Sequence, residues 1–359
     1  MSKILSIIVP SYNMEAYLPK CLGSLIIDDK ELLQKLDVIV VNDGSKDRTS
    51  EIAHEFEAKY PGVFRVIDKA NGHYGSCVNR GLAEAKGVFV KILDADDTFE
   101  TESFKSYLNL LVGLCTAEGE GGEVDLIVSD FQTVDVYGSP TAPLRSFPYP
   151  SGEAFGIDAI ARNDRLWFQM HALAYRTERL REMNYKQIEG VMYSDTEWTI
   201  VPLFAVRKVR YFPVRLYLYL MGREGQSMAA AVWDKGFHDR VKVVLDIAKS
   251  IAKQVEHVCP ANRELVDLFV FEGIKNIYTT FFLKCGVDEI NSSLRKFDAD
   301  LKAVDANAYA RIRKVTFPIR WGFHLIRFWQ DHKWSDGFAG MYLKVYSCLV
   351  RIALWFLRK

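Results

Sequence analysis

The chain has 359 residues, of which 49% are hydrophobic and 26% are charged, as in an ordinary globular protein with room for one large domain or two. Its formal net charge is zero, but residues 311–359 carry ten basic and two acidic side chains, so this tail has a charge of +8 and the first 310 residues have −8. This asymmetry suggests an anionic surface as partner, and no nucleic acid is expected.

The cysteines and the hydrophobic segments predict the compartment. Six cysteines are scattered without a C-x-x-C pair, and the first strand pattern begins by Ile4 with no signal peptide before it. Both features favour a reducing cytoplasm over secretion. No stretch reaches the roughly 18–20 uninterrupted apolar residues that a membrane-spanning helix needs. We therefore expect a cytoplasmic protein that does not cross the membrane.

The first hundred residues alternate between predicted strands and predicted helices. Strands separated by helices of this length are typical of βαβ units, so the predicted fold class is α/β with a doubly wound, mixed but mostly parallel sheet. The expected strands are Ile4–Val9, Val38–Val41, Val63–Ile67 and Val88–Leu93, and the expected helices are Glu15–Leu25, Arg48–Tyr60 and Cys77–Ala85.

The rest of the chain changes character after Ser227. Before it we expect strands at Val124–Ser129 and Tyr211–Leu220 and a helix over Ser194–Val206, whereas Leu166–Thr177 is ambiguous. After it only amphipathic helices are expected, over Trp233–Val258, Glu264–Leu283 and Ile290–Val304. The predicted organisation is an α/β domain over residues 1–228, a helical domain over 229–310 and a basic amphipathic segment over 311–359.

The predicted strand Val88–Leu93 ends in the acidic sequence Asp94-Ala95-Asp96-Asp97. Asp94 and Asp96 are two residues apart, so in strand geometry their side chains point to the same side. Paired carboxylates just past a strand suit a hard divalent cation that is shared with substrate phosphates. The alternative is that Asp97 caps a helix beginning near Thr98 while the other two carboxylates are solvated.

Polar residues follow three of these strands and are expected to converge on one crevice. They are Ser11–Asn13, Asn42–Ser45 and Asp94–Asp96. Tyr12 could stack on a base and Asp43 could accept its hydrogen bonds, although each segment is by itself an ordinary turn or cap. Neither G-x-G-x-x-G nor the Walker sequence is present, so a metal on Asp96 is expected to neutralise a nucleotide diphosphate.

Four segments, Ser6–Leu18, Val41–Thr49, Asn71–Gly81 and Leu93–Asp97, resemble in order and spacing the successive motifs of family 2 glycosyltransferases. The resemblance is strong over residues 4–105 and weaker up to 228. It implies a GT-A fold, an inverting transfer from a nucleotide-diphosphate sugar, and Mn²⁺ or Mg²⁺ as cofactor. The residues implied to bind donor or metal are Pro10, Tyr12 and Asn13 near the base, Asp43 at the nucleoside, Asn71, Gly72 and Asn79 in the sugar–nucleotide pocket, Asp94 near the ribose and Asp96 on the metal.

The same resemblance extends to Tyr193–Trp198, where it implies that Asp195 is the base that accepts the proton of the acceptor hydroxyl. The family more often has Glu before this Asp, whereas Ser194 stands here. Ser194 to Glu197 also reads as a helix capping box. Arg223, with Gln226 and Ser227, is similar to a segment that closes over the diphosphate, and an exposed loop arginine is the alternative.

Three further features are interpreted without that resemblance. His171 is expected to be a core histidine rather than an acceptor contact. Arg320, His324, Arg327 and Asp331 would form one helical stripe, and Lys344, Arg351 and Arg358 recur every seven residues within Met341–Lys359, as in helices at a membrane interface. The alternative is that these helices pack on the protein. Gln330–Trp334 imitates the Q-x-x-R-W motif of processive synthases, which we interpret as coincidence.

The predicted function is therefore a non-processive, metal-dependent transfer of one sugar, most readily from a UDP-sugar, in polysaccharide biosynthesis. The acceptor would be a glycan or lipid-linked oligosaccharide at the cytoplasmic face of the membrane, to which the protein binds peripherally. Alternatives are a sugar transferase acting on polyprenyl or dolichyl phosphate, a sugar-nucleotide pyrophosphorylase, and a non-catalytic nucleotide- or membrane-binding scaffold.

Overall fold

The computed structural model describes residues 2–116, 124–161, 168–223, 226, 236–253, 260–285, 287–316, 324–332, 345 and 348. The chain divides into two compact units. The first consists of residues 1–239 and 258–266, and the second of residues 240–257 and 267–359.

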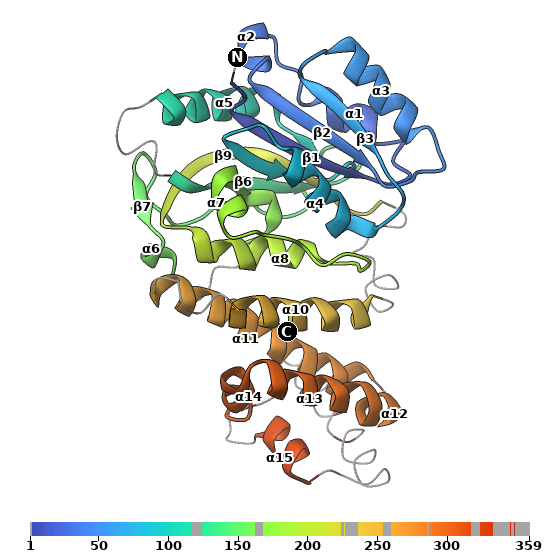
Figure 1. Cartoon of the computed structure of the whole chain (residues 1–359), viewed down its shortest axis with the longest axis vertical. Helices are drawn as coiled ribbons and strands as arrows, with labels where there is room; N and C mark the ends of the chain where they lie inside the picture. The colour runs from blue at the N-terminus through green and yellow to red at the C-terminus, as the bar shows by residue number, and fades with distance from the viewer. Residues whose placement is uncertain are drawn as a thin grey trace. The chain divides into compact units, whose positions relative to one another are not determined.

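The first unit is built on one sheet, which contains nine strands within the described ranges (Figure 1). Its order is β3-β2-β1-β4-β8-β6-β9-β5, and β7 pairs with β9. The longest pairings, β1 with β2 and β6 with β9, are parallel, while β8 joins β4 and β6 in antiparallel fashion. The strands are β1 (Leu5–Ser11), β2 (Leu36–Asn42), β3 (Phe64–Asp68), β4 (Phe89–Ile92), β5 (Thr98–Phe99), β6 (Val124–Val134), β7 (Ala154–Gly156), β8 (Leu173–Arg176) and β9 (Lys208–Leu220).

The amino-terminal half of the sheet confirms the predicted doubly wound, mostly parallel α/β fold. Every residue of β1 and β2 is buried, as expected for strands covered on both faces. The chain runs outward from β1 to β3 and then returns past β1 to β4, so right-handed crossovers place α4 on the face opposite α3. The helices here are α1 (Leu18–Gly23), α2 (Lys30–Leu33), α3 (Thr49–Lys59) and α4 (His73–Glu84).

The segment after the acidic sequence differs from the alternative in which a helix begins near Thr98. Thr98 and Phe99 form β5, which pairs with β9, and α5 (Thr101–Thr116) begins only after Glu100, whose carboxylate accepts the Ser103 amide at 2.7 Å. Asp97 caps no helix. Its carboxylate accepts the Tyr217 hydroxyl at 2.6 Å and the Leu220 amide at 2.7 Å, so it joins the bend after β4 to the end of β9.

The second half of the first unit contains short helices between its strands. They are α6 (Asp158–Ala161), the 3₁₀ turn η2 (Met170–Ala172), α7 (Thr177–Glu182), α8 (Asp195–Ile200) and η3 (Val201–Ala205). The single helix expected over Ser194–Val206 is therefore divided, since Pro202 has no amide hydrogen with which to continue an α-helix. The ambiguous segment becomes η2 and β8 over its described part.

The described part of the second unit is helical, which confirms the predicted helical extension. It contains most of α10 (Phe237–Lys253) and α11 (Pro260–Lys284), then α12 (Val287–Glu289), the π-turn η4 (Ile290–Leu294), α13 (Arg295–Val304), α14 (Ala306–Ile312) and α15 (Leu325–His332). Across the described ranges, every helix is too short or too polar to span a bilayer.

Helix α15 shows how part of the basic tail packs. Leu325, Ile326 and Trp329 are at most 5% exposed, and the Trp329 ring meets those of Tyr278 and Phe282 edge-on. The apolar face of this helix is therefore buried within the second unit and is not available to a membrane. Arg320, Lys344, Arg351 and Arg358 lie outside the described residues.

Candidate functional site

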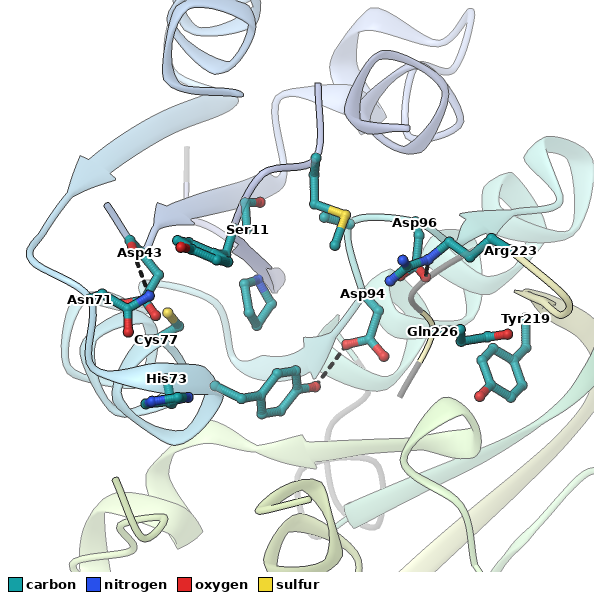
Figure 2. Close-up of a pocket in the computed structure, with 15 residues that line it drawn as sticks. Ser11, Asp43, Asn71, His73, Cys77, Asp94, Asp96, Tyr219, Arg223 and Gln226 are labelled. Atoms are coloured by element: carbon teal, nitrogen blue, oxygen red, sulfur yellow. Dashed lines mark hydrogen bonds and ion pairs between the residues drawn. The ribbon is translucent and has the colours of Figure 1, made fainter. Parts of the chain in front are cut away.

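A cavity of about 390 Å³ opens at the carboxyl ends of β1, β2 and β4, where the strand order reverses (Figure 2). This is the place where open α/β sheets bind ligands, and the volume is that of a small-molecule site. The cavity brings together residues from five separate segments. They are Pro10, Ser11, Tyr12, Met14, Asp43, Asn71, His73, Tyr74, Cys77, Asp94, Ala95, Asp96, Tyr219, Arg223 and Gln226.

One end of the cavity is formed around Asp43. This carboxylate is 3% exposed, and its Oδ1 accepts the Lys69 ammonium at 2.5 Å and the Gly72 amide at 2.9 Å. The Asn71 side chain donates to the Asp43 carbonyl at 3.0 Å. Asn71 and Gly72 therefore hold Asp43 in a fixed orientation, while Tyr12, 46% exposed, presents its ring to the same space.

Asn13 and Asn79, two predicted binding residues, do not belong to the described lining of this cavity. Asn13 adopts φ +53°, and its side-chain oxygen accepts the Lys46 amide at 2.8 Å, which joins the loops after β1 and β2. Asn79 exchanges two hydrogen bonds with the Gln187 backbone, at 2.9 and 2.8 Å. Both side chains therefore fix loops around the cavity in this structure.

The acidic bend after β4 forms the opposite end. Asp94 Oδ1 accepts the Tyr74 hydroxyl at 2.8 Å. Burial, reinforced by the charge of Asp96, raises the pKa of Asp94 to about 7. The pKa of Asp97 is also raised, first by burial and then by Asp96 and Asp94. Close carboxylates that meet only neutral donors resist ionisation, so this bend would bind a cation favourably.

Asp96 differs from its neighbours because it forms an ion pair with Arg223 (Figure 2). The two side chains are only 11% and 15% exposed, and the guanidinium also lies 5.5 Å from the centre of the Tyr17 ring. The Gln226 side chain accepts the Gly222 amide at 2.9 Å and donates to the Leu220 carbonyl at 2.6 Å, which folds this segment back toward the bend. Arg223 is thus not an exposed loop arginine. Ser227 lies outside the described residues.

Asp195 is the first residue of α8 and lies close to the cavity. Its charge acts on Asp94, Tyr74 and Tyr219, three of the lining residues. Burial raises the pKa of Asp195, and the backbone amides of Asp195 and Thr196 oppose this effect. The predicted capping box is not formed, because Ser194 makes no side-chain cap hydrogen bond and Glu197 instead accepts the Ile188 amide at 2.6 Å.

The loop before α8 is packed against the first turns of α4. The Gly190 amide donates to the Gly72 carbonyl at 3.1 Å, and Asn79 holds Gln187. At Gly75 a Cβ atom would lie 2.1 Å from the Ile188 carbonyl oxygen, so only glycine fits there. Since this loop leads directly into α8, α4 helps to set the position of Asp195.

Two buried residues behind the cavity were not among the predicted site residues. Lys91 is fully buried in β4, where its ammonium donates to the carbonyls of His171 at 2.6 Å and Leu173 at 3.2 Å, and burial lowers its pKa to about 7. The His171 ring stacks on Tyr219 with centroids 4.3 Å apart. A charged residue inside the apolar run Val88–Leu93 was the sequence signal for Lys91.

Comparisons with known proteins show that the chain is similar to glycosyltransferases. Residues 6–149 match the family model "Glycosyl transferase family 2". The chain is 34% identical over 229 residues to EpsJ of Bacillus subtilis, an uncharacterized glycosyltransferase, with 61% of each chain covered. It is 26% identical over 321 residues to YibD of Escherichia coli, also an uncharacterized glycosyltransferase, with 80% of this chain and 88% of YibD covered.

The fold is found in a solved structure as well. S. aureus TarS 1–349, determined in complex with UDP-GlcNAc, is 19% identical, with a TM-score of 0.62 over 85% of this chain and 82% of TarS. The chain thus has a GT-A-like fold, and its residues 6–149 are similar to the family 2 glycosyltransferases. It spans 61% of the length of EpsJ.

Proposed function

We propose that the chain transfers one sugar, with inversion, from a nucleotide-diphosphate sugar to a hydroxyl of a glycan or lipid-linked oligosaccharide in polysaccharide biosynthesis. The observation that carries this proposal is the convergence of Tyr12, Asp43 and the bend Asp94–Asp97 on one cavity, with Asp195 close by. A UDP-sugar is the first donor to test, because the TarS structure contains UDP-GlcNAc.

In the proposed donor complex, Tyr12 lies against the base and Asp43 accepts hydrogen bonds from the nucleoside. The network of Lys69, Asn71 and Gly72 holds Asp43 in place for this contact. The diphosphate would lie toward Asp96 and Arg223. A guanidinium can bind two phosphate oxygens at once, so Arg223 would leave Asp96 and neutralise part of the diphosphate charge.

The acidic bend fits a divalent cation, since it offers three carboxylates and Arg223 pairs with only one of them. We propose Mn²⁺ or Mg²⁺, with Asp96 as a ligand in the donor complex. When bound, such a cation stabilises the negative charge of a departing nucleotide diphosphate.

Asp195 is proposed as the general base. Inversion requires the acceptor oxygen to attack from the side opposite the leaving group, and a carboxylate on that side can take its proton. Asp195 is the first residue of α8, which lies far in sequence from the strands proposed to bind the donor. Its raised pKa suits a group that must accept a proton. Tyr219 and Gln226 line the space nearby.

The experiment is a screen of UDP-, GDP- and dTDP-sugars with Mn²⁺, measuring donor hydrolysis, sugar transfer to a lipid-linked oligosaccharide, and thermal stabilisation. We expect one nucleotide class to stabilise the protein and to be turned over, and Asp195→Asn to lower the rate about 10²–10⁴-fold without losing donor binding. Absence of response to every donor would reject the proposal.

Two alternatives are tested by the same assay. A transferase acting directly on polyprenyl or dolichyl phosphate would give a product with one sugar on the lipid phosphate, which mass spectrometry distinguishes from an extended oligosaccharide. A non-catalytic scaffold would bind nucleotide without turnover, and Asp96→Asn and Asp195→Asn would leave its function unchanged.

A further inference from the structure

A cluster of three potential metal ligands lies at the wall of the cavity, which one of them, Asp94, also lines. One carboxylate oxygen of Asp94, one of Asp97 and one ring nitrogen of His171 lie within 4.8 Å of one another. They come from two elements: both carboxylates from the bend after β4, and His171 from η2, just before β8. Because β4 and β8 are paired neighbours in the sheet, this proximity is fixed by the fold.

One ring nitrogen of His171 belongs to this cluster. The residue is 8% exposed, and its buried Nδ1 has no hydrogen-bond partner among the described residues. A neutral imidazole binds a metal ion through the ring nitrogen that carries no proton.

The orientation of this imidazole is fixed by its surroundings. Its ring contacts those of Tyr219, Tyr217 and Phe131, with centroids 4.3, 4.7 and 5.3 Å away. The His171 carbonyl accepts the Lys91 ammonium at 2.6 Å, which anchors the backbone. Because the imidazole is already held in one orientation, little reorganisation would accompany metal binding.

The charge of the cluster also favours a cation. Asp94 receives the Tyr74 hydroxyl, and Asp97 receives the Tyr217 hydroxyl and the Leu220 amide, all of them neutral donors. Asp96 is already paired with Arg223. Lys91 lies close enough to repel a cation, but its ammonium is directed to two backbone carbonyls rather than to a carboxylate. Asp97 is buried and Asp94 is half-buried beside it, and a divalent cation would offset the repulsion between these two carboxylates.

We propose that His171 is a nitrogen ligand of the divalent cation, together with Asp94 and Asp97, in the chain free of donor. In this state Asp96 remains paired with Arg223, and the ion pair breaks only when a diphosphate binds. The proposal rests on the proposed function for its role in sugar transfer, but the site itself exists without a donor. Imidazole favours transition metals over Mg²⁺, so the site should bind Mn²⁺ in preference to Mg²⁺.

The test is a titration of the full chain with Mn²⁺ alone, followed by electron paramagnetic resonance. We expect one bound Mn²⁺ whose spectrum shows hyperfine coupling to a ¹⁴N nucleus, and this coupling should change in protein made with ¹⁵N-histidine. This measurement uses the unaltered protein, so it does not depend on the folding of a variant. Mg²⁺ should displace the bound Mn²⁺ only at large excess.

Substitutions identify which histidine supplies the nitrogen that couples to Mn²⁺. His171→Gln should abolish the coupling and weaken Mn²⁺ binding about tenfold or more. His73→Gln is the matched control, because His73 lines the same cavity outside the cluster, and it should keep the coupling. Asp96→Asn should keep donor-free Mn²⁺ binding. Circular dichroism would check that each variant is folded.

The outcomes separate this proposal from the proposed function. Bound Mn²⁺ without nitrogen coupling, or coupling that disappears in His73→Gln instead, overturns the His171 site even if sugar transfer is observed. Nitrogen coupling together with absence of turnover for every donor would support the site and reject the transferase. Loss of all donor-free Mn²⁺ binding in Asp96→Asn would also overturn the proposal.

Discussion

Asp195 and Asp94 are carboxylates beside the same cavity, and burial raises the pKa of both. Their partners differ. Asp94 accepts a tyrosine hydroxyl and lies next to Asp96, whereas the groups that lower the pKa of Asp195 are backbone amides at the start of α8. Among the described residues, no side chain is thus a hydrogen-bond partner of the Asp195 carboxylate, whereas Asp94 belongs to the acidic bend.

The pH dependence of transfer should report the proposed base. A general base acts only when deprotonated, so activity should fall on the acidic side as pH drops through the raised pKa of Asp195, above the ordinary value of 3.8. Asp195→Glu should keep part of the activity and move this acidic limb. The measurement is kcat/KM against pH at saturating Mn²⁺. A limb that stays unmoved in Asp195→Glu would belong to another group, such as Asp94.

Residues that end a strand were easier to predict than residues that pack behind it. Asp43, Asp94 and Asp96 stand where an apolar run stops, so their place at the crevice followed from the sheet. His171 was expected to be a core histidine, and it is indeed buried. Its proximity to Asp97 depends on the antiparallel pairing of β8 with β4, which no local pattern encodes.

At the scale of elements, the contact between α4 and the loop before α8 connects the donor side of the cavity to Asp195. This loop contacts Gly75 and Asn79 in α4 and Gly72 just before it. The contact explains why glycine stands at position 75, inside the first turn of α4. The backbone of Ile188 approaches so closely that a side chain at position 75 has no room.

A pair of helix glycines tests this contact. Gly75→Ala would place its Cβ 2.1 Å from the Ile188 oxygen, so we expect a loss of about 1–3 kcal/mol in the free energy of unfolding and reduced transfer. Gly113→Ala in α5 meets nothing within 4 Å and should stabilise the protein by up to about 1 kcal/mol. Urea unfolding gives both values. Equal effects of the two substitutions would contradict the packing role of Gly75.

Element boundaries set by tertiary contacts escaped prediction. The strands β1, β2 and β4 were expected within a few residues because their apolar runs are continuous. The helix α4 begins at His73, before the start of the helix expected over Cys77–Ala85, with His73 itself at φ +65°. Thr98 and Phe99 become β5 only because β9, more than a hundred residues later, pairs with them.

At the scale of the whole molecule, the charge asymmetry remains the basis of the membrane proposal. Because the apolar face of α15 is buried, residues 325–332 are not part of the proposed membrane-binding segment. Val345 and Cys348, which lie within Met341–Lys359, are exposed. The proposal of peripheral binding at the cytoplasmic face of the membrane therefore concerns Met341–Lys359.

Vesicle binding tests that proposal. The chain should sediment with vesicles that contain anionic lipid and not with neutral ones. Replacing Lys344, Arg351 and Arg358 by Gln together should weaken this binding by about 3 kcal/mol, roughly 100-fold. Three exposed lysines of the first unit, Lys30, Lys59 and Lys86, give a matched control when replaced by Gln, with little expected effect. Equal loss in both variants would indicate a general charge effect instead.

The link from Asp97 to Tyr217 and Leu220 has a consequence for protein engineering. These hydrogen bonds join residues that lie 120 and 123 positions apart in sequence. A chimera that takes its first half from one relative and its second half from another would keep one partner of the link and replace the other. Such a chimera should therefore lose stability wherever the two relatives differ at Asp97, Tyr217 or the end of β9, and transplanting these positions as a set should restore it.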